Sequence, residues 1–379
     1  MLTSTDRILT TSTGSLPRPP HLAAIFVHRE TGAADPTTDD ELQMLVTQAV
    51  DGVVAHQTEI GIDIVSDGEM GKIGYSTYVK ERLTGFGGEA GALELADLAD
   101  YPEFTERALH GLVTATPACT GPITYIGHDA LQRELHDFAE ARKAHQGPDA
   151  FIPAASPGVI SIFLANQYYP SHEDYLNALA DAMAVEYRAI VDAGFVLQID
   201  CPDLAMGRHI GTKPAPIQDF VDSISVHVKA LNRALKGIDP TRVRIHLCWG
   251  NYEAPHHHDI DLAVILPTVL TVHAQGLVLE ASNPRHAHEW RVFEQIPLPE
   301  DKILVAGVID TSSNYIEHPE VVAERIVRFA SVVGRDRVIA GTDCGFSTFA
   351  SFLPVEPRIA WAKLTSLTEG ARIASSQLF

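Results

Sequence analysis

Short apolar runs alternate along the chain with longer stretches in which apolar residues recur every three to four positions. The short runs are rich in Val, Ile and Leu at consecutive positions, which is typical of parallel strands buried on both faces. They predict eight strands, within residues 8–13, 62–69, 151–158, 195–200, 243–248, 277–282, 302–310 and 337–343. The longer stretches predict helices between them, including 39–60, 216–236, 318–332 and 356–375.

The best marked helix follows the run 151–158. Ser171 and Asp174 resemble a capping box, although Asp takes the place of the usual Glu. Helical spacing is then kept by Leu176, Leu179, Met183, Tyr187 and Ile190. Gly194 is a suitable stop signal, because glycine readily adopts the left-handed backbone conformation at helix ends.

Eight strand–helix units predict an α/β fold with a parallel sheet, either a closed (β/α)8 TIM barrel or an open doubly wound sheet. Polar side chains favour closure, because they fall at the carboxyl ends of the strands, which a barrel gathers around one mouth. They are Ser15, Asp67, Glu69, Ser156, Asp200, His246, Cys248, Glu280, Asp310 and Cys344. We predict one barrel domain over residues 1–379, with an insertion after the second strand at roughly 70–150 that covers the mouth or forms an oligomer contact.

Four of these residues have the chemistry of a zinc site: His246, Cys248, Glu280 and Cys344. Two thiolates, an imidazole and a carboxylate are usual zinc ligands. Residues i and i+2 of a strand point to the same face, so His246 and Cys248 can converge on one ion. The alternative is a pair of buried thiols with a core histidine and a surface glutamate.

Other metal-binding residue types have weaker sequence support. Cys119 and Cys201 are expected to be small buried residues rather than ligands. The histidine run 256–258 resembles a metal tract, but solvated histidines in a loop are the expected alternative.

Composition narrows the class of protein. The chain has 379 residues, 45% of them hydrophobic, and a formal net charge of −21. Such a negative charge argues against nucleic acid or an anionic membrane as partner. No apolar run of membrane-spanning length occurs, the amino-terminal stretch MLTSTDRILTT lacks the apolar core of a signal peptide, and four cysteines are too few for a disulfide framework. We therefore expect a cytoplasmic enzyme.

The stretches TGSLPRP, SDGEMGK, LQIDCPDLA, HLCWG, LEAS and GTDCG resemble the cobalamin-independent methionine synthases, specifically their catalytic carboxy-terminal barrel. The resemblance implies zinc as cofactor, held by the four residues named above. It also implies that the thiol substrate is bound near Ser15, Glu69 and Asp200.

Longer stretches are similar to the epoxyalkane:coenzyme M transferases. They are TGPITYIG (120–127), HLCWGNYEAPH (246–256), SNPRHAHEWRVFE (282–294) and IAWAKLTSLTEGARIAS (359–375). Both resemblances imply a zinc-dependent S-alkyltransferase, in which a metal-activated small-molecule thiol attacks an alkyl or methyl donor. A free thiol titrates near pH 8.5, so metal coordination is what makes it nucleophilic at neutral pH.

The sequence departs from these families after the seventh predicted strand. In GVIDTSSNYIEHPE, Ser312 stands where a histidine acid is expected. Asp310 and Ser312 are therefore the candidate catalytic groups, with a histidine from another loop as the alternative. Arg285 and His286 are candidates for binding a substrate anion, and a structural ion pair is their alternative role.

Two further function classes stay open. One is a barrel lyase or decarboxylase of the uroporphyrinogen decarboxylase superfamily, which lacks this ligand set. The other is a non-catalytic zinc-dependent binding protein, in which a closed four-ligand site has no position for substrate. Self-association into a homo-oligomer is compatible with either.

Overall fold

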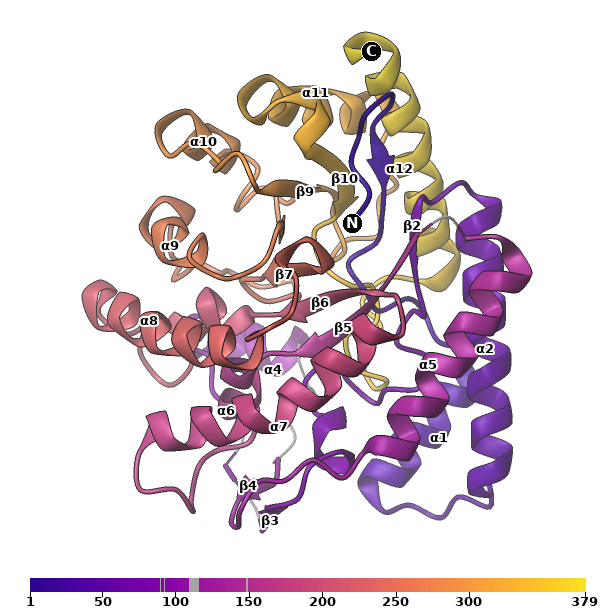
Figure 1. The fold of residues 1–379 in the computed structure, drawn as a ribbon. Coiled ribbons are helices and arrows are strands. Elements are labelled where there is room, and N and C mark those ends of the chain that lie inside the picture. The colour runs from indigo at the N-terminus through magenta and orange to yellow at the C-terminus, as the bar shows by residue number, and fades with distance from the viewer. Residues whose placement is uncertain (89, 92, 109–115, 148) are drawn as a thin grey trace.

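The computed structural model describes residues 1–88, 90–91, 93–108, 116–147 and 149–379. Its centre is a sheet of eight parallel strands (Figure 1). They are β1 (Leu9–Thr10), β2 (Ile64–Ser66), β5 (Asp149–Ala155), β6 (Val196–Asp200), β7 (Val243–Leu247), β8 (Gly276–Leu279), β9 (Ile303–Ile309) and β10 (Val338–Thr342). Six of them lie within the ranges that the apolar runs predict, and β5 and β8 begin two residues and one residue before their predicted ranges.

The strand order closes the sheet into a barrel. The order is β1-β10-β9-β8-β7-β6-β5-β2, and a parallel bridge between Thr11 and Ile64 joins the two end strands. The hydroxyl of Thr11 also donates a hydrogen bond to the carbonyl of Ile64 over 2.9 Å. The predicted TIM barrel is thus confirmed, and the open doubly wound alternative is wrong.

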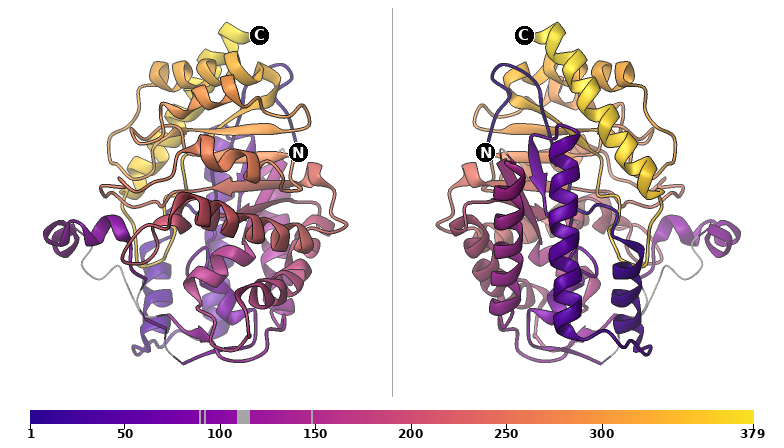
Figure 2. Two further views of the ribbon diagram at one scale, coloured as in Figure 1. Left: turned by 90° about the vertical axis from the view of Figure 1, so that its left-hand side faces the viewer. Right: turned by 90° about the vertical axis from the view of Figure 1, so that its right-hand side faces the viewer.

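Helices surround the barrel on its outer face (Figures 1 and 2). They are α1 (Pro20–Thr31), α2 (Asp39–Glu59), α5 (His128–His145), α6 (Pro157–Phe163), α7 (His172–Asp192), α8 (Ile217–Ala234), α9 (Leu262–Val269), α10 (Val292–Gln295), α11 (Pro319–Val333) and α12 (Pro357–Leu378). Every residue of the barrel strands is buried. The strands therefore carry apolar side chains toward the helices as well as the interior, which explains their uninterrupted apolar runs.

Helix α7 begins as predicted, with one difference in its cap. The backbone N–H of Asp174 donates to Oγ of Ser171 over 3.1 Å. The Asp174 carboxylate accepts from the Ser171 hydroxyl over 2.7 Å, so it does not close a full capping box onto the backbone. Asp is one methylene shorter than Glu, which explains this shorter-range contact. Gly194 follows the helix with φ +88°, a conformation that glycine adopts freely.

The predicted insertion has two structurally different parts. Its first part contains β3 (Phe86–Gly87), α3 (Ala96–Ala99), α4 (Pro102–Ala108) and β4 (Ala118–Cys119). Its second part is α5, which packs against α2 through hydrogen bonds from Gln43 and Thr47 to Asp137. Helix α5 thus occupies the regular position between β2 and β5. Residues 89, 92, 109–115 and 148 of the predicted insertion lie outside the described residues.

The first part of this segment contacts the loops at the mouth of the barrel, where the carboxyl ends of the strands meet. Gly74 forms an antiparallel bridge with Phe349, just beyond β10. Leu95 forms another with Ile210, in the loop after β6. The segment is therefore fastened to two different mouth loops.

We find no helix in the described part of the chain that combines the length and hydropathy needed to cross a bilayer.

Candidate metal centre

Three of the predicted ligands meet at the mouth of the barrel. His246 is the second-last residue of β7, Cys248 directly follows that strand, and Cys344 lies just beyond β10. All three side chains are buried, and their ligand atoms lie within 4.8 Å of one another. The sulfurs of Cys248 and Cys344 are 3.9 Å apart. The barrel therefore brings together residues that are nearly a hundred positions apart in sequence.

This arrangement fits a tetrahedral zinc ion. Zinc–sulfur distances of about 2.3 Å place two sulfur ligands about 3.8 Å apart, close to the observed separation. Nδ1 of His246 donates to Oδ1 of Asp200 over 3.1 Å, while Nε2 is buried with no hydrogen-bond partner among the described residues. A buried polar atom without a partner is costly, and a metal would satisfy it.

The electrostatics of the cluster also favour a bound cation. The adjacent Cys344 thiol, burial and the charge of Glu280 raise the pKa of Cys248 well above that of a free thiol. Burial alone would lower the pKa of His246, but the hydrogen bond with Asp200 and the nearby sulfur of Cys248 outweigh it and raise that pKa to about 10. A divalent cation reverses both tendencies, because it stabilises thiolate and neutral imidazole.

Glu280, the fourth predicted ligand, is close but lies outside the three-residue group. It is buried just after β8, and its Oε1 accepts the backbone N–H of Trp249 over 2.8 Å. Its Oε2 accepts from Asn283 over 2.8 Å and from Arg285 over 3.0 Å. Both carboxylate oxygens of Glu280 thus accept hydrogen bonds, and coordination of a metal would require the loss of one of these bonds.

Arg285 and His286 are held in ion pairs. Arg285 contacts Asp259 over 2.9 Å in addition to Glu280. His286 pairs with Glu289 over 2.7 Å and with Asp259 over 3.1 Å, and its side chain is buried. This is the geometry of the structural ion pair that the sequence left as the alternative to anion binding.

Glu69 has an unusual conformation and environment. Its backbone φ is +57°, a strained value for a residue with a side chain, and such strain clusters at functional sites. Burial, with the charges of Asp200 and Asp67, raises the pKa of Glu69 to about 8. Its Oε2 is buried and lacks a hydrogen-bond partner within the part of the chain that the structure describes. Glu69 therefore has free capacity to bind a polar group.

Arg18 contacts the backbone of Glu69, and Ser15 contacts the loop after β10. Arg18 is buried and donates to the carbonyl of Glu69 over 2.9 Å and to that of Ser347 over 2.7 Å. The carbonyl of Ser15 accepts the backbone N–H of Phe346 over 2.8 Å. The amino-terminal motif is thereby tied to the loop that carries Cys344.

Asp310 is surrounded by hydrogen-bond donors. The backbone N–H and the hydroxyl of Ser312 donate to its Oδ1 over 2.9 and 2.8 Å, and the hydroxyl of Ser313 donates to its Oδ2. Burial would raise the pKa of Asp310, but these hydrogen bonds lower it. Asp310 is therefore an ionised acceptor at neutral pH and does not carry a proton to donate.

Sequence reasoning missed two carboxylates that organise the site. Asp343 accepts the backbone N–H groups of Ala281, Ser282 and Asn283 at 2.9 Å each, which fixes the loop after Glu280. Its position beside Cys344 at a strand end was an available signal. Asp259 pairs with both Arg285 and His286, but it lies in an irregular loop whose sequence gives no such indication.

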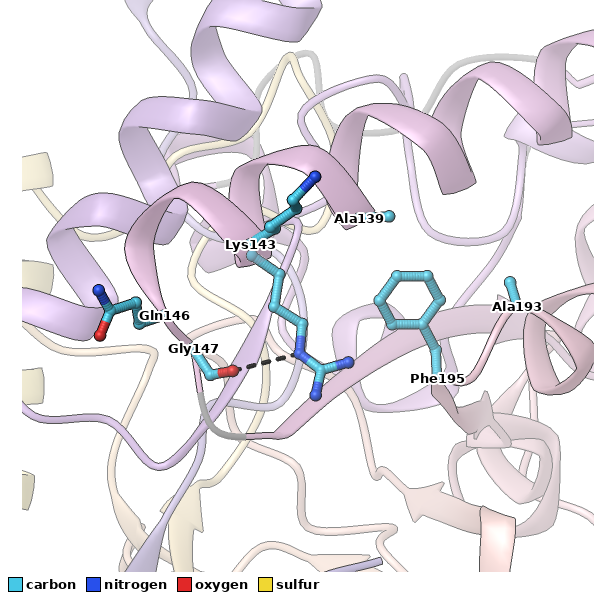
Figure 3. Close-up of a pocket in the computed structure, with 7 residues that line it drawn as sticks. Ala139, Lys143, Gln146, Gly147, Ala193 and Phe195 are labelled. Atoms are coloured by element: carbon cyan, nitrogen blue, oxygen red, sulfur yellow. Dashed lines mark hydrogen bonds between the residues drawn. The ribbon is translucent and has the colours of Figure 1, made fainter.

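A surface pocket lies at the opposite end of the barrel (Figure 3). It is lined mainly by the end of α5 and by Ala193 and Phe195, which precede β6. These residues are at the amino-terminal ends of the strands, whereas TIM barrel active sites lie at the carboxyl ends. We therefore place the candidate site at the metal cluster rather than in this pocket.

Comparisons with known proteins identify the family of this chain. Residues 163–352, half of the chain, match the family described as the catalytic domain of cobalamin-independent synthase. A methionine synthase of Saccharolobus solfataricus is 26% identical over 97% of this chain and 95% of its own length. That of Thermococcus kodakarensis is 25% identical, over 96% of this chain and 93% of its own length.

A solved structure shares the whole architecture. The B12-independent methionine synthase from Shewanella sp. W3-18-1, in complex with selenomethionine, superposes with a TM-score of 0.75 at 21% identity. The match covers 98% of this chain and 99% of that one. At such identity the likeness supports the fold alone, and the sequence match supplies the family. The chain belongs to the cobalamin-independent methionine synthase family.

Proposed function

We propose that this protein is a zinc-dependent methyltransferase that transfers a methyl group to the thiol of homocysteine. The observation that carries the proposal is the buried group of His246, Cys248 and Cys344 at the barrel mouth. The family and the methionine synthase relatives support homocysteine as the thiol.

His246, Cys248 and Cys344 would hold the zinc ion. A bound Zn²⁺ lowers the pKa of a coordinated substrate thiol and so makes it nucleophilic at neutral pH. We propose Glu280 as a fourth, exchangeable ligand, because its hydrogen bonds to Trp249 and Arg285 compete with coordination. A catalytic zinc site needs such an open or exchangeable position.

Asp200 is the positioning residue for His246. Its Oδ1 accepts the Nδ1 hydrogen of His246 and also a hydrogen bond from Gln198 over 2.9 Å. The hydrogen bond between His246 and Asp200 fixes the tautomer of the imidazole, so that Nε2 is unprotonated and faces away from Asp200. Such outer contacts orient metal-ligating histidines and raise their basicity.

Glu69 and Asp200 would bind the ammonium group of homocysteine. Both carboxylates are buried, and Oε2 of Glu69 has no partner in the described residues. Because the pKa of Glu69 is raised to about 8, an incoming ammonium ion would displace its proton. Arg18 would keep Glu69 in place through its backbone carbonyl, and Ser15 would shape the adjacent wall.

Asp310 and Ser312 would act together at the methyl-donor side. Ser312 donates its hydroxyl hydrogen to Asp310, and the lowered pKa of Asp310 keeps that carboxylate ionised. We therefore propose that the pair orients the methyl-donor substrate, with the Asp310 carboxylate accepting a hydrogen bond from it. Protonation of the leaving group falls to another group or to solvent.

The test combines metal content, thiol binding and product formation. Purified protein is expected to contain zinc, to bind homocysteine in calorimetry, and to form methionine from homocysteine and methyltetrahydrofolate, detected by mass spectrometry. Cys344→Ser is expected to lose the zinc ion at this centre, homocysteine binding and methionine formation. A folded wild-type protein that carries zinc and binds no homocysteine would contradict the proposal.

The same assay separates the other function classes. Binding of coenzyme M in place of homocysteine would favour thiol alkylation of the epoxyalkane type. Zinc without binding of any small thiol would favour a purely structural metal. Absence of zinc after purification in zinc-supplemented medium would favour the lyase or decarboxylase alternative.

A further inference from the structure

The histidine run 256–258 divides into one buried and two surface residues. His256 is buried, with a left-handed backbone φ of +50°. The turn at His256 leaves His257 and His258 at the surface, where their side chains are 35% and 24% exposed. The two surface histidines face the insertion segment, not the catalytic cluster.

His257 and His258 converge on a single carboxylate. Nε2 of His257 lies 3.0 Å from Oδ2 of Asp100, and Nε2 of His258 lies 2.8 Å from the same oxygen. The two imidazole rings lie against each other with centroids 4.0 Å apart, and Tyr101 packs edge-on against His257. Three ligand-type atoms from two separate segments are thus already gathered at one point.

We propose that Asp100, His257 and His258 form a second metal site, which binds a divalent transition-metal ion such as Zn²⁺ or Ni²⁺. Two imidazoles and one carboxylate select this class of ion over Mg²⁺ or Ca²⁺, which prefer oxygen ligands. Ligands about 2.1 Å from a tetrahedral ion lie about 3.4 Å apart. The observed nitrogen–oxygen separations of 2.8 and 3.0 Å need only a small outward shift of exposed side chains.

A neighbouring buried trio of Asp97, His209 and His256 is less suited to a metal, although its ligand atoms are equally close. The hydroxyl of Tyr252 contacts both Asp97 and His209, over 3.0 and 3.2 Å. The Arg285 guanidinium lies 2.8 Å from Nδ1 of His256. Members of this trio are thus already hydrogen-bonded to Tyr252 and Arg285, and the adjacent positive charge of Arg285 opposes a cation.

Within the described residues, Asp100 forms no ion pair with a lysine or an arginine that would compete with a metal ion. Within the described ranges, its ion-pair partners are His257 and His258. Hydrogen bonds from His258 and His257 lower the pKa of Asp100, so its carboxylate is ionised. A metal would replace the two imidazole hydrogens between these groups.

A cation at this position would connect two parts of the molecule. Asp100 caps the end of α3, in the segment that projects from the side of the barrel in Figure 2. His257 and His258 belong to the loop that continues from Cys248. The second site would therefore fasten the projecting segment to the loop that begins at the catalytic cluster.

Metal stoichiometry tests the proposal independently of the catalytic centre. Wild-type protein and the His257→Ala/His258→Ala variant are dialysed against buffered micromolar free zinc, and bound zinc is measured by mass spectrometry. The variant is expected to bind one equivalent fewer than wild type. His136→Ala, which removes an exposed histidine of α5, is the matched control and should bind as wild type does.

A second readout localises the effect. Added zinc is expected to slow hydrogen–deuterium exchange in residues 94–108 and 249–261 of wild type and of Cys344→Ser, but not of the double variant. Equal zinc content in wild type and the double variant would overturn the proposal, as would zinc-independent exchange in these segments. Loss of one zinc equivalent from Cys344→Ser, with unchanged zinc-dependent exchange in these segments, would show that the second site binds zinc independently of the catalytic centre.

Discussion

Asp200 and His246 are directly paired residues on the neighbouring strands β6 and β7, and the Asp200 carboxylate accepts the Nδ1 hydrogen of His246 over 3.1 Å. Strand register therefore fixes the orientation of a metal ligand. The contact involves no flexible loop, so the imidazole is held in place before any metal arrives. Pre-organisation of this kind favours tight metal binding.

Asp200→Asn is expected to weaken zinc binding 10- to 100-fold, the usual cost of losing an outer carboxylate of a metal-bound histidine. The amide can present its NH₂ to His246 and so favour the wrong tautomer. Zinc affinity is measured by competition with a chromophoric chelator. Asp192→Asn, on the exposed end of α7, is the control, and an unchanged affinity in Asp200→Asn would contradict this role.

Cys344→Ser and Cys119→Ser are expected to behave oppositely. Cys344 supplies a sulfur 3.9 Å from that of Cys248, whereas Cys119 is buried and contacts the carbonyl of Gly121. The first variant should lose the catalytic zinc while keeping its circular dichroism spectrum, and the second should retain the metal. Retention of zinc at this centre by Cys344→Ser would exclude the proposed ligand set.

Arg285→Ala is expected to destabilise the fold by about 3 kcal/mol, because it leaves the buried carboxylate of Glu280 without its cation and removes one of the cationic partners of Asp259. The effect is measured by urea denaturation. Arg233→Ala breaks an exposed pair with Asp181 and should cost at most about 1 kcal/mol. Equal effects of the two substitutions would mean that the Arg285 network carries no special stability.

Glu69→Gln is expected to weaken homocysteine binding by tenfold or more, since a hydrogen bond to a charged group contributes about 1.5–3 kcal/mol. Zinc content should stay unchanged, because Glu69 is not a proposed ligand. Calorimetry gives the affinity, and Glu81→Gln, at the exposed position 81, is the control. If Glu69→Gln lost zinc and kept its affinity for homocysteine, Glu69 would act on the metal centre and not on the substrate.

His286 predicts a pH dependence of stability. Burial lowers its pKa, but hydrogen bonds with Asp259 and Glu289 outweigh burial and raise it from 6.5 to about 10. The imidazolium therefore stabilises the folded state fully below pH 6.5, and this contribution is lost as pH rises toward 10. Urea denaturation across this interval should show wild type losing more stability than His286→Gln. Parallel pH profiles would show that His286 is neutral in the folded protein.

Most of the fold could be predicted from the sequence, because parallel barrel strands are buried on both faces and leave continuous apolar runs. Ser171 and Gly194 likewise mark the two ends of α7 through local backbone chemistry. The role of α5 was less visible. Its apolar positions are few, since one face contacts α2 partly through the polar side chain of Asp137, so the sequence pattern assigns α5 to the insertion.

Strand ends fix positions that a sequence pattern can predict, whereas contacts between loops leave no such pattern. His246, Cys248 and Cys344 lie at or just beyond strand ends, so the barrel itself brings them together. The sequence left open whether Arg285 binds an anion or forms an ion pair, because Asp259 lies in an irregular loop and no sequence periodicity connects the two residues. The hydrogen bonds that Ser312 and Ser313 donate to Asp310 are likewise contacts within a loop, which no sequence periodicity predicts.

Cys248 and Cys344 follow β7 and β10, which are separated in the barrel by β8 and β9. An ion bound to both sulfurs would link strands that share no backbone hydrogen bonds. The pair of sulfurs exists only once the eighth barrel strand has taken its place, so a partly assembled chain would offer an incomplete set of donors. Metal uptake would then come late in folding and would select chains whose barrel is already closed.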